Sequence, residues 1–209
     1  MDMRFIDYNK WDRKDIFEFF SRIPDPFYMV TYKEDVTELR DYVKKRNLSF
    51  YLAMTYVICR SINDADAFHY CLHDQKIAYL PERRPSFTDL AKGSDHFKIV
   101  NEDLGDDLDS FVRRAKEKSA NQKEFLIPSE ERDDLIYITC LPWLKLTALH
   151  NEGLSDKDDS IPRVSWGQYE EEKGRTVLGL SFEVNHRFID GVHLGQVHQN
   201  FRNYLEKLK

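Results

Sequence analysis

The feature that most constrains the fold is an alternation of apolar and polar residues close to the C-terminus. From Thr176 to Val184 every second side chain is a large apolar one: Leu178, Leu180, Phe182 and Val184. Successive side chains of a β-strand point to opposite faces, so this period places the four on one buried face of a sheet. The alternation ends at Asn185, where a polar stretch leads into the start of a helical pattern.

The rest of the chain supplies the partners for such a strand. Short β-like runs are expected at 27–32, 68–72, 76–80, 97–100, 135–140, 144–149 and 163–169. Helical spacing of apolar residues is expected at 13–20, 36–43, 49–63, 106–118 and 191–208. These patterns predict an α+β fold, a two-layer sandwich in which a large mixed sheet has helices packed on one side. We find no linker or internal repeat, so residues 1–209 are expected to form one domain.

Composition and charge exclude several classes of protein. The formal net charge of −6 argues against a broad nucleic-acid-binding or anionic-membrane surface. The hydrophobic fraction of 41% is enough for a core, which rules out disorder over the whole length. The three cysteines have no CxxC spacing, and no run of 18 apolar residues is present. We therefore expect a cytoplasmic protein without a disulfide framework, a membrane span or a nucleic-acid partner.

The stretch from Val184 to Gly191 contains the best candidate for chemistry. A strand ends there in His186, which is followed by Asp190 and then by Gly191 at the start of a helix. Histidine is the usual side chain for taking a proton near neutral pH. Taken alone, this pattern is also that of an ordinary surface histidine near a turn.

Four marks along the chain resemble the trimeric chloramphenicol acetyltransferases. The His-His-x-x-x-Asp-Gly signature of that family stands here as Asn185-His186-Arg187-Phe188-Ile189-Asp190-Gly191. The others are Trp11-Asp12-Arg13 followed by Phe17, Phe19 and Phe20; Thr139-Cys140-Leu141-Pro142-Trp143; and Ser165-Trp166-Gly167-Gln168-Tyr169. Because the marks come in the family's order, the resemblance implies its fold over nearly the whole chain.

The resemblance also implies a reaction, in which an acetyl group moves from acetyl-coenzyme A to a hydroxyl of chloramphenicol or a similar small alcohol. His186 is then the general base, and Thr139 supplies the hydroxyl that stabilises the oxyanion. Ser165 is expected beside that oxyanion, and Tyr169 against the adenine of coenzyme A. Acetyl-coenzyme A is a co-substrate, and no permanently bound cofactor or metal is expected.

The family precedent assigns Asp190 to an ion pair with Arg13 that supports the loop carrying His186. Phe19 and Phe20 are expected at the substrate pocket. The resemblance further implies a homotrimer in which the histidine of one subunit faces a pocket built by its neighbour.

This sequence departs from the family pattern at four positions. Asn185 replaces the first histidine of the signature, and Thr139 stands where serine is usual. Phe20 stands where many members have tyrosine, and Gln168 where a basic residue often precedes the tyrosine.

Three alternatives stay open at this point. His186-Arg187-Phe188-Ile189-Asp190-Gly191 also resembles the acyltransferase core of 2-oxoacid dehydrogenase complexes. A non-catalytic trimeric binding module of the same fold is a second possibility. A zinc site at His69, Cys71 and His73 is a third and weaker one, because no fourth ligand lies nearby. The acidic run Asp156-Lys157-Asp158-Asp159 is expected to be a solvated loop.

Overall fold

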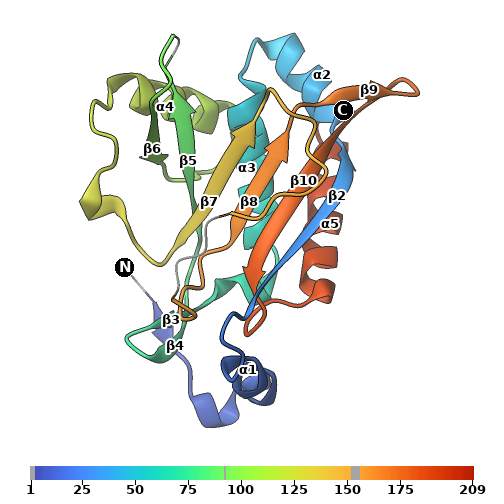
Figure 1. Ribbon diagram of the computed structural model, residues 1–209. Coiled ribbons are helices and arrows are strands. Elements are labelled where there is room, and N and C mark those ends of the chain that lie inside the picture. Colours follow the sequence, from blue (N-terminus) through green and yellow to red (C-terminus); the bar gives the residue numbers. More distant parts are fainter. Residues whose placement is uncertain (1–2, 92, 152–155) are drawn as a thin grey trace.

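The computed structural model describes residues 3–91, 93–151 and 156–209. The expected α+β class is confirmed, with a large mixed sheet that has helices on one side (Figure 1). The elements in chain order are β1 (Arg4–Phe5), η1 (Tyr8–Lys10), α1 (Lys14–Ser21), β2 (Phe27–Asp35), α2 (Thr37–Arg46), α3 (Phe50–Asn63), η2 (Asp66–His69), β3 (Tyr70–His73), β4 (Lys76–Tyr79), β5 (Arg84–Leu90), β6 (Phe97–Asn101), α4 (Leu108–Asn121), η3 (Pro128–Glu130), β7 (Leu135–Leu141), β8 (Arg163–Gly167), β9 (Glu170–Glu172), β10 (Arg175–Asn185) and α5 (Gly191–Glu206).

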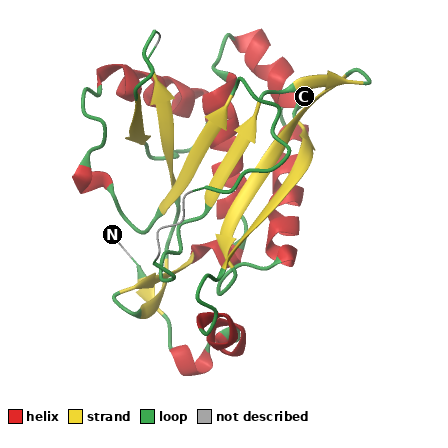
Figure 2. Cartoon of the chain, in the orientation of Figure 1, coloured by secondary structure: helices red, strands yellow, loops and turns green. Residues whose placement is uncertain are grey.

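The large sheet has the strand order β2-β10-β8-β7-β5-β6, with β9 paired to one end of β10. The pairs β5–β7 and β7–β8 are parallel, and the other pairs are antiparallel. A separate three-stranded sheet, β1-β4-β3, lies at the lower end beside α1 (Figure 2). This end is also where β10 finishes and the chain turns back into α5.

The core fills the space between the large sheet and the helices behind it. Helix α3 is buried along nearly its whole length, and α5 lies beside it (Figure 1). The four alternating residues of β10, Leu178, Leu180, Phe182 and Val184, all face this core and are each about 1% exposed or less. The period read from the sequence therefore fixes which face of β10 is buried against the helices.

The opposite face of the sheet is covered by an irregular segment instead of a further strand. Residues 144–149, expected as a strand, have no regular structure and run across β8 and β10. Their backbone lies so close that a Cβ on Gly179 would sit 2.0 Å from the Leu146 carbonyl oxygen. A Cβ on Gly167 would likewise sit 2.5 Å from the Leu144 oxygen. The backbone of this segment therefore packs closely on the sheet at the two glycines.

Two other expectations need correction. The sequence pattern does not predict strand β5, because proline normally breaks a strand, yet Pro85 lies in the strand opposite Ile136. The run expected as a strand at 68–72 begins as the short helix η2 and becomes the strand β3 only at Tyr70.

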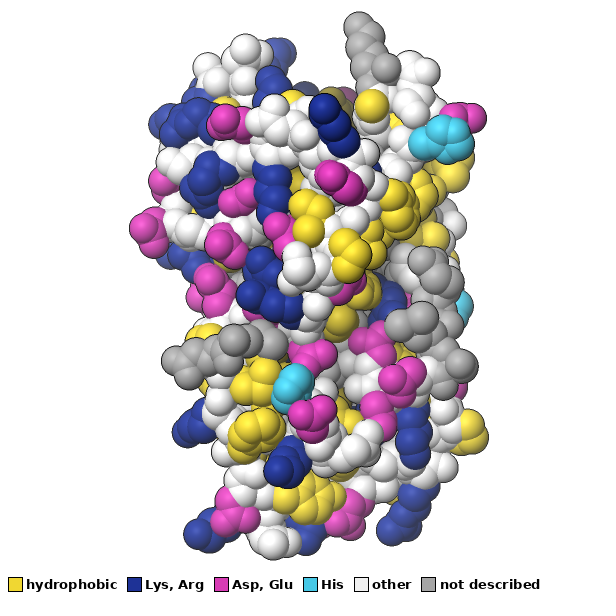
Figure 3. All heavy atoms as spheres, turned by 90° about the vertical axis from the view of Figure 1, so that its left-hand side faces the viewer, with side chains coloured by type: hydrophobic (Ala, Val, Ile, Leu, Met, Phe, Trp, Pro, Cys, Tyr) yellow, Lys and Arg dark blue, Asp and Glu magenta, His cyan; other side chains and the backbone are white. Residues whose placement is uncertain are grey.

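The molecular surface on the side of α4 and β6 carries basic side chains interspersed with acidic ones (Figure 3). Two exposed apolar side chains, Phe97 of β6 and Phe125 in the segment after α4, pack edge to face. Among the residues that the structure describes, no helix is long and apolar enough to cross a membrane.

Candidate functional site

The backbone of His186 is fixed at the point where β10 ends. Its N–H donates to the Pro26 carbonyl at 2.8 Å, which ties it to the chain just before β2. The N–H groups of Phe188 and Ile189 donate to the Asn185 carbonyl at 3.0 and 3.1 Å and close a tight turn. The histidine therefore sits on a rigid corner between a central strand and helix α5.

The imidazole of His186 is held between two aromatic rings. Phe20 of α1 stacks on it with ring centroids 3.9 Å apart, and Tyr28 of β2 lies at 4.3 Å on a tilted plane. Burial lowers the pKa of His186; the Asp190 carboxylate opposes this and the Arg13 guanidinium adds to it. With about a third of its side-chain surface exposed, the ring is a neutral and accessible proton acceptor near pH 7.

Arg13 and Asp190 form the expected ion pair. The Arg13 Nη1 donates to Asp190 Oδ2 at 2.6 Å, and Nη2 donates to Oδ1 at 2.9 Å. The same guanidinium also donates to the carbonyls of His186 at 3.0 Å and Arg187 at 2.8 Å. The side chain of Arg13, the N-cap residue of α1, thus binds two successive carbonyls, that of the base and that of the residue after it. Asp190 Oδ1 lies 3.3 Å from His186 Nε2, so the carboxylate also contacts the ring.

A second guanidinium, that of Arg187, holds this loop from inside. Its side chain is 2% exposed; it donates to Asp158 Oδ1 at 2.9 Å and to the Lys157 carbonyl, and lies over the Phe17 ring. Asn185 donates to two carbonyls of the same segment, those of Lys157 and Asp159. The sequence analysis did not assign these roles.

The expected solvated loop at 156–159 is exposed only in its first half, Asp156 and Lys157, whereas Asp158 and Asp159 are partly buried in ion pairs. Asp158 pairs with the buried Arg187. Asp159 pairs with Arg163 at 2.6 Å, and the side chains of these two residues are each 7% exposed. The physical reason is that a buried guanidinium needs a carboxylate or several carbonyl oxygens as partners. The partner of Asp158 lies 29 positions away, so no local pattern shows that this part of the acidic run is paired.

Thr139 belongs to a row of hydroxyl side chains that crosses the sheet. Thr139 on β7 is in register with Ser165 on β8, Ser165 with Ser181 on β10, and Ser181 with Thr31 on β2. The flanking residues Ile138, Val164 and Phe182 face the helices, so the row lies on the other face. Thr139 is half-buried and Ser165 is 1% exposed.

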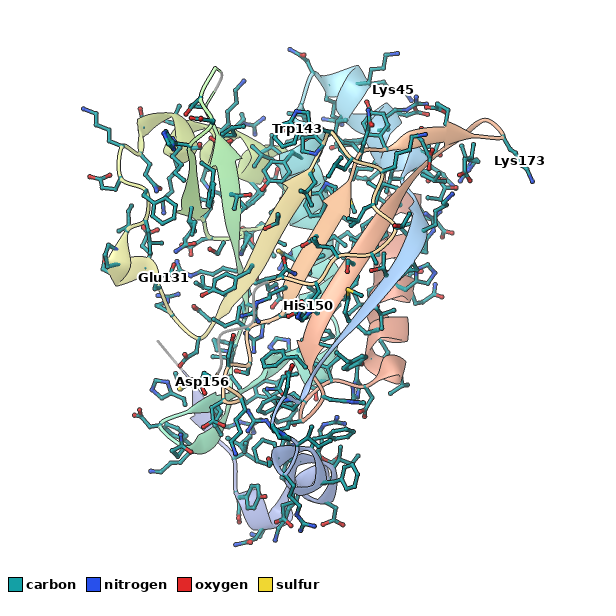
Figure 4. All side chains as sticks on the ribbon, in the orientation of Figure 1. Lys45, Glu131, Trp143, His150, Asp156 and Lys173 are labelled. Carbon is teal, nitrogen blue, oxygen red and sulfur yellow. The ribbon has the colours of Figure 1, made fainter. Side chains whose placement is uncertain are left out.

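The segment over this face provides polar partners for the row. The Ser165 hydroxyl donates to Asn151 Oδ1 at 3.4 Å, and the Ser181 hydroxyl donates to the Leu149 carbonyl at 3.1 Å. Asn151 in turn donates its N–H to the buried Glu183 carboxylate at 2.8 Å, and His150 lies 3.2 Å from the same oxygen. Figure 4 shows Trp143 at the upper end of the sheet and His150 in front of its strands.

One chain does not bring His186 and Thr139 together. His186 continues the helix-facing side of β10, whereas Thr139 points from the other face. Ser181 of β10 is in register with Thr139 through Ser165. His186 is five positions further along the chain than Ser181, a distance of about 16 Å along the strand direction. Thr139 also lies two strands away, roughly 10 Å to the side.

Phe19 and Tyr169 are exposed aromatic residues at opposite ends of the molecule. Phe19 is 61% exposed and packs edge to face on Phe20, so it adjoins His186. Tyr169 follows β8 at the end far from His186, is 44% exposed and packs edge to face on Phe50.

The weak zinc hypothesis has no support in the geometry. The His69 ring nitrogens face the carbonyls of Asn63 and Leu80, and His73 bonds Asp133. Cys71 is buried against Ala78 and Leu80. Within residues 3–91, 93–151 and 156–209, no group of three potential ligands is arranged to hold a metal ion.

Comparisons with known proteins agree with this architecture. The chloramphenicol acetyltransferase of Clostridium butyricum is 25% identical over all of this chain and 95% of its own length. Chloramphenicol acetyltransferase 3 of Escherichia coli is 25% identical over 97% of this chain and 95% of its own.

Among solved structures, a chloramphenicol acetyltransferase superposes with a TM-score of 0.90 at 22% identity, over 98% of this chain and all of that one. The cubic core of the pyruvate dehydrogenase multienzyme complex matches less closely, with a TM-score of 0.65 at 14% identity over 91% of this chain and 85% of that one. Both likenesses show the fold alone. A family model described as "Chloramphenicol acetyltransferase" matches residues 1–202. The chain therefore belongs to the chloramphenicol acetyltransferase family.

Proposed function

We propose that this protein transfers the acetyl group of acetyl-coenzyme A to a hydroxyl of chloramphenicol or a similar small alcohol, with His186 as general base. The observation that carries the proposal is the position and protonation of the His186 ring. Its ring is accessible, is fixed at a rigid corner, and has a lowered pKa that leaves it free to accept a proton.

The reaction follows from the chemistry of a thioester and an alcohol. His186 takes the hydroxyl proton while the alcohol oxygen bonds to the thioester carbonyl carbon. The tetrahedral intermediate then collapses, the carbon–sulfur bond breaks, and the thiolate of coenzyme A takes the proton back from His186. The products are an ester and free coenzyme A, and the histidine returns to its neutral form.

The oxyanion of the intermediate needs a fixed donor, which we assign to the hydroxyl of Thr139 in a second copy of the chain. The separation of His186 and Thr139 within one chain supports this assignment. A site shared between copies fits a closed homotrimer, in which each interface contains one His186 and one Thr139. We assign to Ser165, the neighbour of Thr139 in register, the binding of a water or of the intermediate.

The remaining assignments concern binding and support. Phe19 and Phe20 beside His186 form an apolar wall for the acceptor. The exposed ring of Tyr169 is assigned to the adenine of coenzyme A. Arg13 and Asp190 act on the backbone that carries His186 and have no direct part in the proton transfer.

We also propose that residues 1–209 act as one acetyltransferase domain in a reducing cytoplasm. The core joins residues from α1 to α5 in one cluster, which supports the first statement. The thiols of Cys59, Cys71 and Cys140 are free, which supports the second.

The test is the release of free thiol from acetyl-coenzyme A by the purified protein, with and without chloramphenicol. His186→Ala is compared with wild type and with His96→Ala, a control at a histidine whose side chain is 93% exposed and lies outside the site. We expect chloramphenicol-dependent release that falls about 10²- to 10⁴-fold in His186→Ala and is unchanged in His96→Ala. Equal release by wild type and His186→Ala would refute His186 as the base.

A further inference from the structure

His193 makes an unusual contact in the first turn of helix α5. Asp190 caps this helix in an extended conformation, with φ −110° and ψ 173°. The Asp190 backbone N–H donates to His193 Nδ1 at 2.9 Å. A ring nitrogen that accepts a hydrogen bond has no proton of its own, so the imidazole is neutral and carries its proton on Nε2. A protonated His193 would place two donors against each other.

The residue held by this bond is the one that supports the base. The Asp190 carboxylate is bound by Arg13 through both oxygens and lies 3.3 Å from His186 Nε2. Because the side chain of Asp190 starts from the backbone that His193 caps, a loss of the cap displaces the carboxylate. That displacement reaches His186 directly and also through Arg13, which binds the His186 carbonyl.

The surroundings of His193 favour its neutral form. The ring is half-buried, and the charged groups that face it are Arg13 at the N-cap of α1, Asp66 from η2 and Asp190 of its own cap. Burial lowers the pKa of His193 and the Arg13 cation lowers it further, whereas the carboxylates of Asp190 and Asp66 oppose the shift. The cap is therefore complete near pH 7 and is lost in acid.

We propose that His193 is a positioning residue for His186: its neutral imidazole caps α5 through the Asp190 N–H and so fixes the carboxylate and guanidinium that hold the base. This inference rests on the proposed acetyl transfer. Its consequence is that two histidines, His186 and His193, must both be neutral for turnover.

The first experiment compares His193→Gln with His193→Leu in the thiol-release assay. Glutamine at this helix position reaches back to the cap N–H, as in a capping box, but does not titrate. Leucine cannot accept the bond. At pH 7.5 we expect His193→Gln to stay within about threefold of wild type. We expect His193→Leu to lose about tenfold or more in kcat with KM for acetyl-coenzyme A unchanged, because a misplaced base costs rate.

The pH profile separates positioning from general stability. In acid, kcat/KM of the wild type should fall more steeply than about tenfold per pH unit, because two groups gain protons. His193→Gln should fall by about tenfold per unit, and the exposed-site control His96→Gln should follow the wild type. A wild-type slope retained in His193→Gln, or full activity in His193→Leu, would overturn the proposal.

A second experiment does not depend on turnover. In protein labelled with ¹⁵N-histidine, the His193 resonances are those lost in His193→Gln. We expect an unprotonated Nδ1 and a protonated Nε2 at pH 7.5. A protonated Nδ1 would refute the cap whether or not the protein acetylates an alcohol, whereas absence of turnover with an intact cap would count against the proposed function alone.

Discussion

Substitution of Asp190 by asparagine breaks the Arg13–Asp190 pair with almost no change in volume. In the wild type, two charge-assisted hydrogen bonds of 2.6 and 2.9 Å join side chains that are 11% and 29% exposed. Breaking a fully buried ion pair costs about 3–5 kcal/mol, and an exposed pair contributes about 0–1 kcal/mol. The pair is mostly buried and asparagine keeps one acceptor oxygen, so the substitution should cost about 2 kcal/mol. For a chain of this length that corresponds to a fall in Tm of roughly 4–8 °C.

The assay is urea unfolding at pH 7 and one fixed protomer concentration, for the wild type, Asp190→Asn, Arg13→Met and the double variant. Arg13→Met also loses the bonds to the carbonyls of His186 and Arg187, so it should cost more than Asp190→Asn. Once Arg13 is gone, the second substitution should add little, which gives a coupling energy of about 1–2 kcal/mol. Costs that add to within about 0.5 kcal/mol would refute the pair as the support of this loop.

The same pair has a pH dependence of known sign. The hydrogen bonds and charge of Arg13 lower the pKa of Asp190 in the folded protein. The stabilisation is therefore present above the unfolded pKa of about 3.9 and is lost as the pH falls through the folded value. The difference in unfolding free energy between the wild type and Asp190→Asn should shrink below about pH 4.

Two further predictions concern the sheet face and the base. Gly179→Ala should lower the free energy of urea unfolding by about 3 kcal/mol, because its Cβ would overlap the Leu146 carbonyl. The matched control Gly195→Ala, in open space on α5, should raise it by about 0.5–1 kcal/mol. Equal effects would show that residues 144–149 do not pack on the sheet as described. Phe20→Leu removes the ring stacked on His186 and so reduces its burial, which should raise the pKa of His186 toward about 6.5 and move the acid limb of kcat/KM to higher pH; an acid limb that stays in place would show that Phe20 does not desolvate the base.

The sequence predicts the elements whose signal is local and periodic. The alternation in β10, the helical faces of α3 and α5, and the polar stretch after Val184 all identify structure that the chain forms. The Arg13–Asp190 pair was also expected, although 177 positions separate the two residues, because the family resemblance supplied what no local pattern could.

The features that the sequence analysis missed depend on long-range packing. Residues 144–149 alternate like a strand, but two glycines on neighbouring strands let their backbone lie across the sheet. Arg187 and Asn185 fix a segment some 26–30 positions away, and nothing local shows that this acidic run is their partner. His193 carried a usable signal, since it stands three positions after a helix-capping aspartate.

The proposed reaction requires a site shared between two copies of the chain. Subunit mixing of His186→Ala with Thr139→Val tests this directly, since each parent alone lacks one of the two groups. When the two are co-expressed in equal amounts, half of the histidine positions and half of the threonine positions are intact. We therefore expect about a quarter of the wild-type rate of thiol release. A mixture no more active than the mean of its two parents would contradict the shared site.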